Sequence, residues 1–388
     1  MRLRAVPAVC AAAILLSACA TRAHYGVTTH IDPISGTCDH ARNVEVGASL
    51  DLSGPQSALG HEYLTGVQMA VADVNRSGGI LKNHSCLELL YKDDRGDGHI
   101  GDRAVLDLVN DEVVAFMVGP FESSSVAFAG ADLGLAGVPN TDFSSLNQLH
   151  AASSYPMTFA TAPSNRTTAS ALVAYAKSQH WSRVAVAAVD DVGGRQALSD
   201  FEAAAEPAGL ALAGAATIDG DAGAGVDQLS STRPDGLIVL GDSLAVGPIL
   251  SARTQARWTV PTVAAAVAAD QAVAARAGTG VSVLVPAAAV TTSQEFNPAL
   301  RSFAARLKLS TGSVIPYAEA YDGVSMLAYA ANSINSTHAA NVRTFLENAN
   351  YQGLLASYGY TSSRHTGVAT EQLSVVGLDK LSGGLFGG

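Results

Sequence analysis

Four cysteines carry the most specific chemistry in this 388-residue sequence. Cys19 follows Leu16-Ser17-Ala18 at the end of an apolar run that begins behind two arginines. A short basic N-terminal segment, an apolar stretch and small residues before the cleavage site are typical of a secretory signal peptide. Small residues followed directly by cysteine are typical of a bacterial lipoprotein signal, in which the cysteine thiol is acylated. We therefore expect a lipid anchor on Cys19 at the outer face of the cytoplasmic membrane, with an extracytoplasmic body. An ordinary cleaved signal with an incidental cysteine is the alternative.

Two further cysteines favour a disulfide. Cys10 leaves with the signal, so Cys38 and Cys86 are the two that remain in the folded body. Each lies just before a strand-like run, Val44–Leu50 and Leu87–Tyr91. The first two strands of a doubly wound sheet are parallel neighbours, so they start at the same edge of the sheet and the cysteines just before them lie close together. In an oxidising compartment this predicts a Cys38–Cys86 bond, with two free thiols as the alternative.

Composition indicates a large folded body without affinity for nucleic acid. The formal charge is −11 for the whole sequence and becomes −13 once Arg2 and Arg4 are removed with the signal. With 48% hydrophobic and 15% charged residues, the chain has ample core-forming material and no basic patch to attract phosphates. No later apolar stretch is long enough to span a bilayer. A mature chain of about 370 residues predicts two domains.

The elements that position candidate residues follow a repeating βαβ pattern. Short apolar runs alternate with helical stretches, for example a helix over Gly60–Arg76 that ends at Gly78-Gly79. The alternation restarts after Thr158–Pro163, which argues for two α/β units of similar size, each with its own parallel sheet. Neither a phosphate loop nor a dinucleotide fingerprint lies at a strand–helix junction, so we expect no cofactor. The histidines near Cys38 have no metal-ligand spacing, so we expect no metal site.

Several segments in order resemble the type 1 solute-binding proteins of bacterial ABC importers, in particular the leucine/isoleucine/valine-binding branch. They are SGPQSALGHEYLTGVQMAVADVNRSGGI at Ser53–Ile80, Gly119–Ser125, the crossover Phe159–Pro163, and Tyr317–Gly323. The resemblance covers the chain from about Val44 to about Gly377. It implies two doubly wound α/β lobes joined by a three-strand hinge. The expected division is signal peptide 1–19, tether 20–43, first lobe 44–160 and 287–333, and second lobe 161–286 and 334–388.

The same resemblance implies a monomer that closes around one small polar ligand, amino acid-like, and then docks on a membrane permease. A receptor that passes closure to a signalling partner is the alternative within this fold. Ser123 and Ser124 open a helix after a strand, where hydroxyls and free backbone N–H groups suit a carboxylate. Simple helix capping by serine is the other explanation. Phe143 and Ser144 match the turn whose carbonyl and hydroxyl contact the ligand in amino-acid-binding relatives.

The second lobe departs from the family pattern. Asp190-Asp191 stand where relatives place an aromatic ring, and Val263–Ala266 stand where they place an acidic partner for the ligand's ammonium group. A buried ammonium without a carboxylate is costly, so Asp242 or Asp190 is the expected replacement. Otherwise the ligand is not an α-amino acid. Closure of the second lobe is expected to present Asp190, Asp191 and Asp242 to the ligand.

One motif points toward a different class of protein. Gly241-Asp242-Ser243-Leu244 after an apolar strand is similar to the nucleophile block of a lipase/esterase group. Such a serine needs a histidine held by an aspartate. No Asp-x-x-His follows, and the two later histidines are His338 and His365. We therefore expect Gly241–Leu244 to form a loop and the protein not to be an enzyme. Ester hydrolysis through Ser243 is the alternative.

Overall fold

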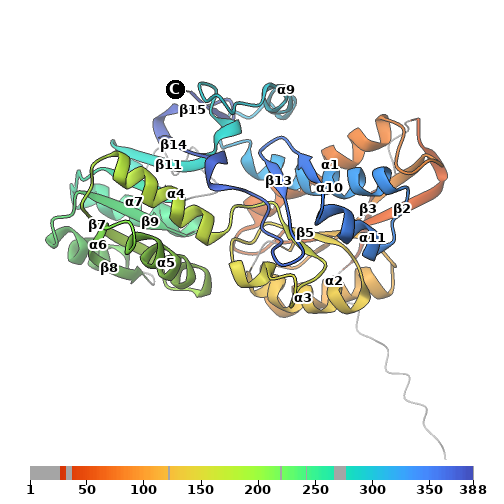
Figure 1. Ribbon diagram of the computed structural model, residues 1–388, viewed down its shortest axis with the longest axis horizontal. Coiled ribbons are helices and arrows are strands. Elements are labelled where there is room, and N and C mark those ends of the chain that lie inside the picture. Colours follow the sequence, from red (N-terminus) through yellow and green to blue (C-terminus); the bar gives the residue numbers. More distant parts are fainter. Residues whose placement is uncertain are drawn as a thin grey trace, which may run out of the picture.

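The computed structural model describes residues 27–31, 37–120, 123–218, 221–241, 243–265 and 277–387. The segment predicted to be a signal peptide, with Cys19, lies outside these residues. Two six-stranded, mostly parallel sheets form two bodies that lie side by side along the longest axis (Figure 1). This confirms the prediction of two doubly wound α/β units.

The first sheet has the strand order β1-β3-β2-β4-β5-β6. Its strands are β1 (Thr29–Ile31), β2 (Asp39–Leu50), β3 (Ser85–Asp93), β4 (Phe116–Val118), β5 (Asn140–Asp142) and β6 (Thr158–Ala160). Its helices are α1 (Ser57–Arg76), α2 (Gly98–Asn110), α3 (Ser123–Ala136), α10 (Ile315–Ile334) and α11 (Ala339–Leu346). One core cluster contains side chains of α1 and α10, and another contains side chains of α2 and α3. The sheet is therefore covered on both faces.

The second sheet has the order β14-β11-β10-β9-β7-β8. Its strands are β7 (Arg183–Val189), β8 (Ala211–Ile218), β9 (Gly236–Leu240), β10 (Thr262–Ala265), β11 (Val281–Pro286) and the antiparallel β14 (Leu373–Gly377). Its helices are α4 (Asn165–Ser178), α5 (Val192–Ala205), α6 (Ala222–Ser231) and α7 (Ser243–Gln255). Val186 packs in one core cluster and its neighbour Ala187 in another. Because both faces are buried, these strands are continuous apolar runs rather than alternating ones.

The disulfide joins the starts of β2 and β3. Cys38 and Cys86 are bonded with their Cα atoms 5.1 Å apart. Asp39 pairs with Ser85 in the parallel register, which brings the two cysteines together. A ring nitrogen of His40 lies within 4.8 Å of both sulfur atoms, but neither sulfur is a free thiolate. The sequence prediction of this bond is confirmed.

The segment expected to be a tether is partly folded. β1 pairs antiparallel with β3 at the edge of the sheet, with Thr29 opposite Tyr91. β2 begins at Asp39, five residues before the apolar run that predicted it. The residues 39–43 are exposed or half-buried, so hydrophobicity did not reveal that they extend the strand.

The chain passes between the two bodies three times. It leaves the first body after β6 for α4. It leaves the second body after α9 (Pro298–Leu307), whose Leu300 and Phe303 pack in the core of the second sheet, and continues into α10. The last passage follows Val368, which packs in the core of the first sheet, and leads into β14.

That last passage differs from the expected boundary at residue 334. Val342 of α11 and Tyr358 of the hairpin β12 (Asn350–Gln352) and β13 (Ser357–Gly359) are buried in the core of the first sheet. Of the segment 334–388 assigned to the second lobe, β14 is the strand that joins the second sheet. The short pair β15 (Leu381–Ser382) and β16 (Leu385–Phe386) packs on that sheet's core.

Within the described part of the chain, every helix is too short or too polar to cross a bilayer.

Candidate functional site

The strand order places a switch point in each sheet. From β2 the chain passes to β3 on one side and returns to β4 on the other, and β7, β8 and β9 repeat this arrangement. Ligands of open α/β sheets bind at the carboxyl ends of strands beside such switch points. Ser123 is the first residue of α3, which follows β4, and Asp190 follows β7 directly. Ser123 and Asp190 therefore both follow strands beside a switch point, although they come from distant parts of the sequence.

Asp142 fixes the turn that follows β5. Its side chain is fully buried, and its carboxylate oxygens lie 3.0 and 3.1 Å from Nε2 of His150. The backbone N–H of Ser144 donates to the same carboxylate at 2.9 Å. Thr161, where the chain leaves the first sheet, donates to the Asp142 carbonyl through both its N–H and its hydroxyl. The resemblance indicated a turn at Phe143 and Ser144, but the sequence gave no signal for His150.

Phe143 is a packing residue as well as a turn residue. Its ring stacks on Tyr63 of α1 with centroids 4.1 Å apart and 7° between the planes. Both side chains are buried, and so is Ser144, which is 2% exposed. The expected role of Phe143 is carried by its backbone carbonyl, so the stacked ring is compatible with it. The aromatic contact holds the turn against the helix that follows β2.

A buried carboxyl lies behind this aromatic pair. The Tyr63 hydroxyl is 3.4 Å from Oε2 of Glu319 in α10. Burial raises the pKa of Glu319 to about 8, with a smaller contribution from the negative charge of Asp322. Burial also raises the pKa of Asp322 to about 7, although backbone N–H groups and Tyr358 stabilise its charged form. The resemblance pointed to the Tyr317–Gly323 helix, but sequence reasoning did not identify Glu319 as a group that titrates near neutrality.

The acidic residues expected from the second sheet already have partners. Asp191 is the N-cap of α5 and accepts from the N–H of Gly194 at 2.6 Å. Asp190 pairs with Nη1 of Arg195 at 2.6 Å, and both side chains are partly exposed. Asp191 is thus committed to its helix, whereas the Asp190–Arg195 pair is exposed enough to exchange partners.

Some predicted residues cannot be placed in detail. Asp242 lies outside the described residues, and the side chains of Ser123, Ser124 and Ser243 do as well. For the esterase alternative, the ring of His365 is engaged by the Thr158 carbonyl at 3.0 Å and by Glu347 at 3.1 Å. Both ring nitrogens of His365 therefore have structural partners near the point where the chain leaves the first sheet.

Direct polar contacts join the two bodies. Asn147, just after the β5 turn, donates to Asp200 of α5 at 2.5 Å and accepts from the N–H of Arg166 in α4. Elsewhere, Arg306 of α9 contacts both carboxylate oxygens of Asp73 in α1, at 2.6 and 3.0 Å. The strand-end residues of the first sheet therefore lie next to helices of the second.

This arrangement can be compared with known proteins. A family model described as periplasmic binding protein matches residues 43–384. The chain belongs to the periplasmic binding protein family. The resemblance to type 1 members of this family is therefore confirmed.

Solved structures of this family share the fold. A type 1 periplasmic binding protein from Bordetella pertussis is 18% identical with a TM-score of 0.75, over 86% of this chain and 96% of that one. The branched-chain amino acid substrate-binding protein LivJ from Streptococcus pneumoniae, in complex with isoleucine, is 18% identical with a TM-score of 0.73, over 87% and 100%. An ABC transporter solute-binding protein from R. palustris, in complex with 4-hydroxybenzoate, has a TM-score of 0.72 at 14% identity, over 89% and 95%.

Curated relatives match over a shorter stretch. The Leu/Ile/Val-binding protein BraC3 of Rhizobium johnstonii is 36% identical over 91 residues, which is 24% of each chain. The matched segment thus spans about a quarter of that relative's length.

Proposed function

We propose that this periplasmic binding protein is the extracytoplasmic substrate-binding component of an ABC importer, anchored by lipid on Cys19. Its ligand is a small carboxylate-bearing metabolite held between the two α/β lobes. The observation that carries the proposal is the pair of switch points in a chain that matches the family over residues 43–384. Structural neighbours that are substrate-binding or solute-binding proteins of transporters, in complex with isoleucine or 4-hydroxybenzoate, support the importer role.

The ligand docks first on the first lobe. Ser123 and Ser124 present hydroxyls and the N-terminal N–H groups of α3, which favour an anionic group. The Phe143–Ser144 turn, held by Asp142, adds a carbonyl and a hydroxyl. Closure then brings the region of Asp190, Asp191 and Asp242 toward the ligand and excludes water, and the closed form docks on a permease.

We infer a carboxylate on the ligand because the two lobes offer different groups to it. The first lobe supplies hydrogen-bond donors, whereas Asp191 is committed to its helix and Asp190 to Arg195. A ligand with an ammonium group requires Asp190 to exchange partners or Asp242 to supply the charge. A carboxylate without an ammonium group requires neither, so both amino acids and aromatic acids fit the proposal.

A thermal-melt screen of the mature chain tests this function. The panel contains leucine, isoleucine, valine, 4-hydroxybenzoate, other organic acids and neutral sugars. A ligand at a thousand times its dissociation constant stabilises the protein by about 4 kcal/mol, which gives a clear shift in melting temperature. We expect a shift with at least one carboxylate and none with the sugars. A shift with sugars alone would contradict the proposed ligand class.

Ser123→Ala tests the site within that function. Loss of a hydrogen bond to a charged ligand group weakens binding by about 1–3 kcal/mol, measured by titration calorimetry with the acid found in the screen. Ser170→Ala is a matched control, since the Ser170 hydroxyl bonds to the carbonyl of Arg166 within α4. Unchanged affinity in Ser123→Ala would show that the ligand lies elsewhere.

A further inference from the structure

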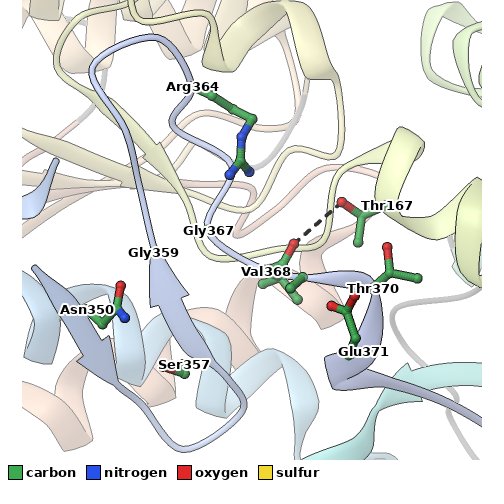
Figure 2. A pocket seen from close by; sticks show the side chains of 10 residues that line it. Thr167, Asn350, Ser357, Gly359, Arg364, Gly367, Val368, Thr370 and Glu371 are labelled. Atoms are coloured by element: carbon green, nitrogen blue, oxygen red, sulfur yellow. Dashed lines mark hydrogen bonds between the residues drawn. The ribbon is translucent and has the colours of Figure 1, made fainter. Parts of the chain in front are cut away.

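A second pocket lies beside the last passage between the two bodies, with a volume of about 450 Å³. Figure 2 shows it between the β12–β13 hairpin and the segment that runs from Arg364 to Glu371. Its polar lining comprises Thr167, Asn350, Ser357, Arg364, Thr370 and Glu371. Neither the Phe143–Ser144 turn nor Asp190 lines it, so it is separate from the strand-end site.

The pocket contains a cation with free donors. Nη1 of Arg364 donates to the carbonyl and the hydroxyl of Thr366, the latter at 2.9 Å. Among the residues that the structure describes, its Nε and Nη2 have no acceptor. In Figure 2 the guanidinium of Arg364 points toward Gly367. The bonds to Thr366 fix the side chain and leave its other N–H groups without an acceptor among the described residues.

The pocket also contains an unpaired carboxylate. Glu371 lies on the short helix Thr370–Gln372, at the opposite end of the pocket from Arg364 in Figure 2. No cationic side chain of the described segments lies within ion-pair distance of Glu371. The rest of the polar lining consists of neutral donors and acceptors of Thr167, Asn350, Ser357 and Thr370. Arg364 and Glu371 are both exposed, so the pocket is open to solvent. An open pocket lined by one cation, one anion and neutral polar groups is complementary to a molecule that carries both charges.

We propose that this pocket binds a small zwitterion, with its carboxylate on Arg364 and its ammonium group on Glu371. A guanidinium suits a carboxylate because its parallel N–H groups match the two oxygens. The volume exceeds that of a short amino acid, so water fills the remainder. This inference concerns a second site and holds whatever ligand occupies the strand-end site.

The pocket is lined by residues of both bodies, so a ligand bound there would affect how the bodies are arranged. Thr167 belongs to α4, which packs on the second sheet, whereas the β12–β13 hairpin packs on the core of the first. The Thr167 hydroxyl also lies 3.5 Å from the Val368 carbonyl. A ligand that touches both sides binds one arrangement of the bodies better than another, and it therefore shifts the equilibrium between them.

The test uses three amino acids whose charges lie at increasing separation. Glycine, β-alanine and 4-aminobutanoate are titrated into the mature protein and followed by calorimetry. We expect saturable binding of at least one, weakened tenfold or more by Glu371→Gln and by Arg364→Gln. Butanoate and butylammonium, which each carry one of the charges, should bind at least tenfold more weakly than 4-aminobutanoate if that is the preferred length.

Control variants separate this site from the strand-end site. Ser144→Ala should leave the zwitterion affinity unchanged within twofold, and Glu206→Gln should do the same as an exposed charge control. Arg364→Gln also removes the hydrogen bonds to Thr366 and can therefore disturb the local structure. Glu371→Gln is the cleaner test, because it removes a charge that pairs with no cationic side chain of the described residues. Absence of saturable binding would overturn the proposal, and so would binding that Ser144→Ala abolishes and Glu371→Gln leaves intact. Binding that Ser144→Ala abolishes would place the zwitterion at the strand-end site and so support the proposed function, whereas absence of saturable binding would leave the carboxylate screen unaffected.

Discussion

Asp142 is the residue on which the geometry of the candidate site depends most. Replacing it with alanine leaves His150 and the Ser144 N–H without their acceptor in a fully buried position. We expect Asp142→Ala to lower the free energy of unfolding by about 2–4 kcal/mol, measured by urea denaturation.

Asp190→Ala is the comparison for that change. Its carboxylate pairs with Arg195 on the surface, and exposed ion pairs contribute about 0–1 kcal/mol. Equal losses of stability in the two variants would mean that the Asp142 contacts do not hold the turn.

Glu319 makes the stability of the protein depend on pH near neutrality. Its pKa is raised by burial from 4.5 to about 8, so the folded state favours the protonated form. The associated stability is fully present below pH 4.5 and is lost as pH rises toward 8. Asp322 acts in the same direction, with its pKa raised to about 7.

Glu319→Gln should therefore flatten the decline in unfolding free energy between pH 5 and pH 8. Urea titrations at several pH values measure this slope, and Glu206→Gln serves as an exposed control. A slope that Glu319→Gln leaves unchanged would show that Glu319 is ionised throughout this range in the folded protein.

At the residue scale, local patterns predicted positions but not partners. Phe143 and Ser144 follow the strand that ends at Asp142, and the family resemblance placed them in a turn there. His150 and Tyr63 reach the same turn from a 3-10 helix and from α1. Such contacts depend on how separate elements pack, and no spacing within one segment encodes them.

The disulfide stabilises the pair β2–β3 at the edge of the first sheet. It closes a loop with a sequence separation of 48. Chain-entropy arguments give about 4 kcal/mol for a loop of this length. We expect the double variant Cys38→Ser, Cys86→Ser to lose stability of this order in urea denaturation.

Reduction of the wild-type protein by dithiothreitol should reproduce that loss, whereas the double variant should be insensitive to the reductant. Equal stability of the oxidised and reduced wild-type protein would contradict the expected contribution.

At the scale of elements, buried strands and amphipathic helices were predicted well. α1 was expected over Gly60–Arg76 and extends over Ser57–Arg76, because its apolar stripe and terminal glycines are local signals. β1 was missed because its three residues, Thr-His-Ile, show no repeating pattern. Its position comes from pairing with β3, which is information that lies outside the segment.

The contact between Asn147 and the second body is relevant to the whole molecule. Asn147 bonds to the Asp200 carboxylate and to the Arg166 N–H. We expect Asn147→Ala to destabilise this arrangement of the bodies by about 1–3 kcal/mol relative to a more open one. Distances between one spin label on each body, measured by pulsed electron resonance, should shift toward longer values.

Gln228→Ala on α6 is the control for that measurement, since it changes an exposed side chain on one body. An unchanged distance distribution in Asn147→Ala would show that the contact does not determine how the bodies are arranged.

The allocation of the C-terminal segment was the part of the architecture that the sequence could not settle. The β12–β13 hairpin is held to the first body because Asp322 of α10 accepts from Leu354, Leu355 and Tyr358. These bonds connect residues more than thirty positions apart. α11 packs on the same core through Val342 and Leu346. Nothing in the composition of the segment distinguishes the core that it joins.

The early start of the folded body limits how far it can stand from a membrane. β1 begins at Thr29, so residues 20–28 separate it from Cys19. An extended chain of that length spans about 30 Å, whereas the 24 residues first expected in the tether would span about 80 Å. If Cys19 is acylated, the protein is confined to a layer about one molecular diameter thick above the lipid. Within that layer a permease encounters it by diffusion in two dimensions rather than three.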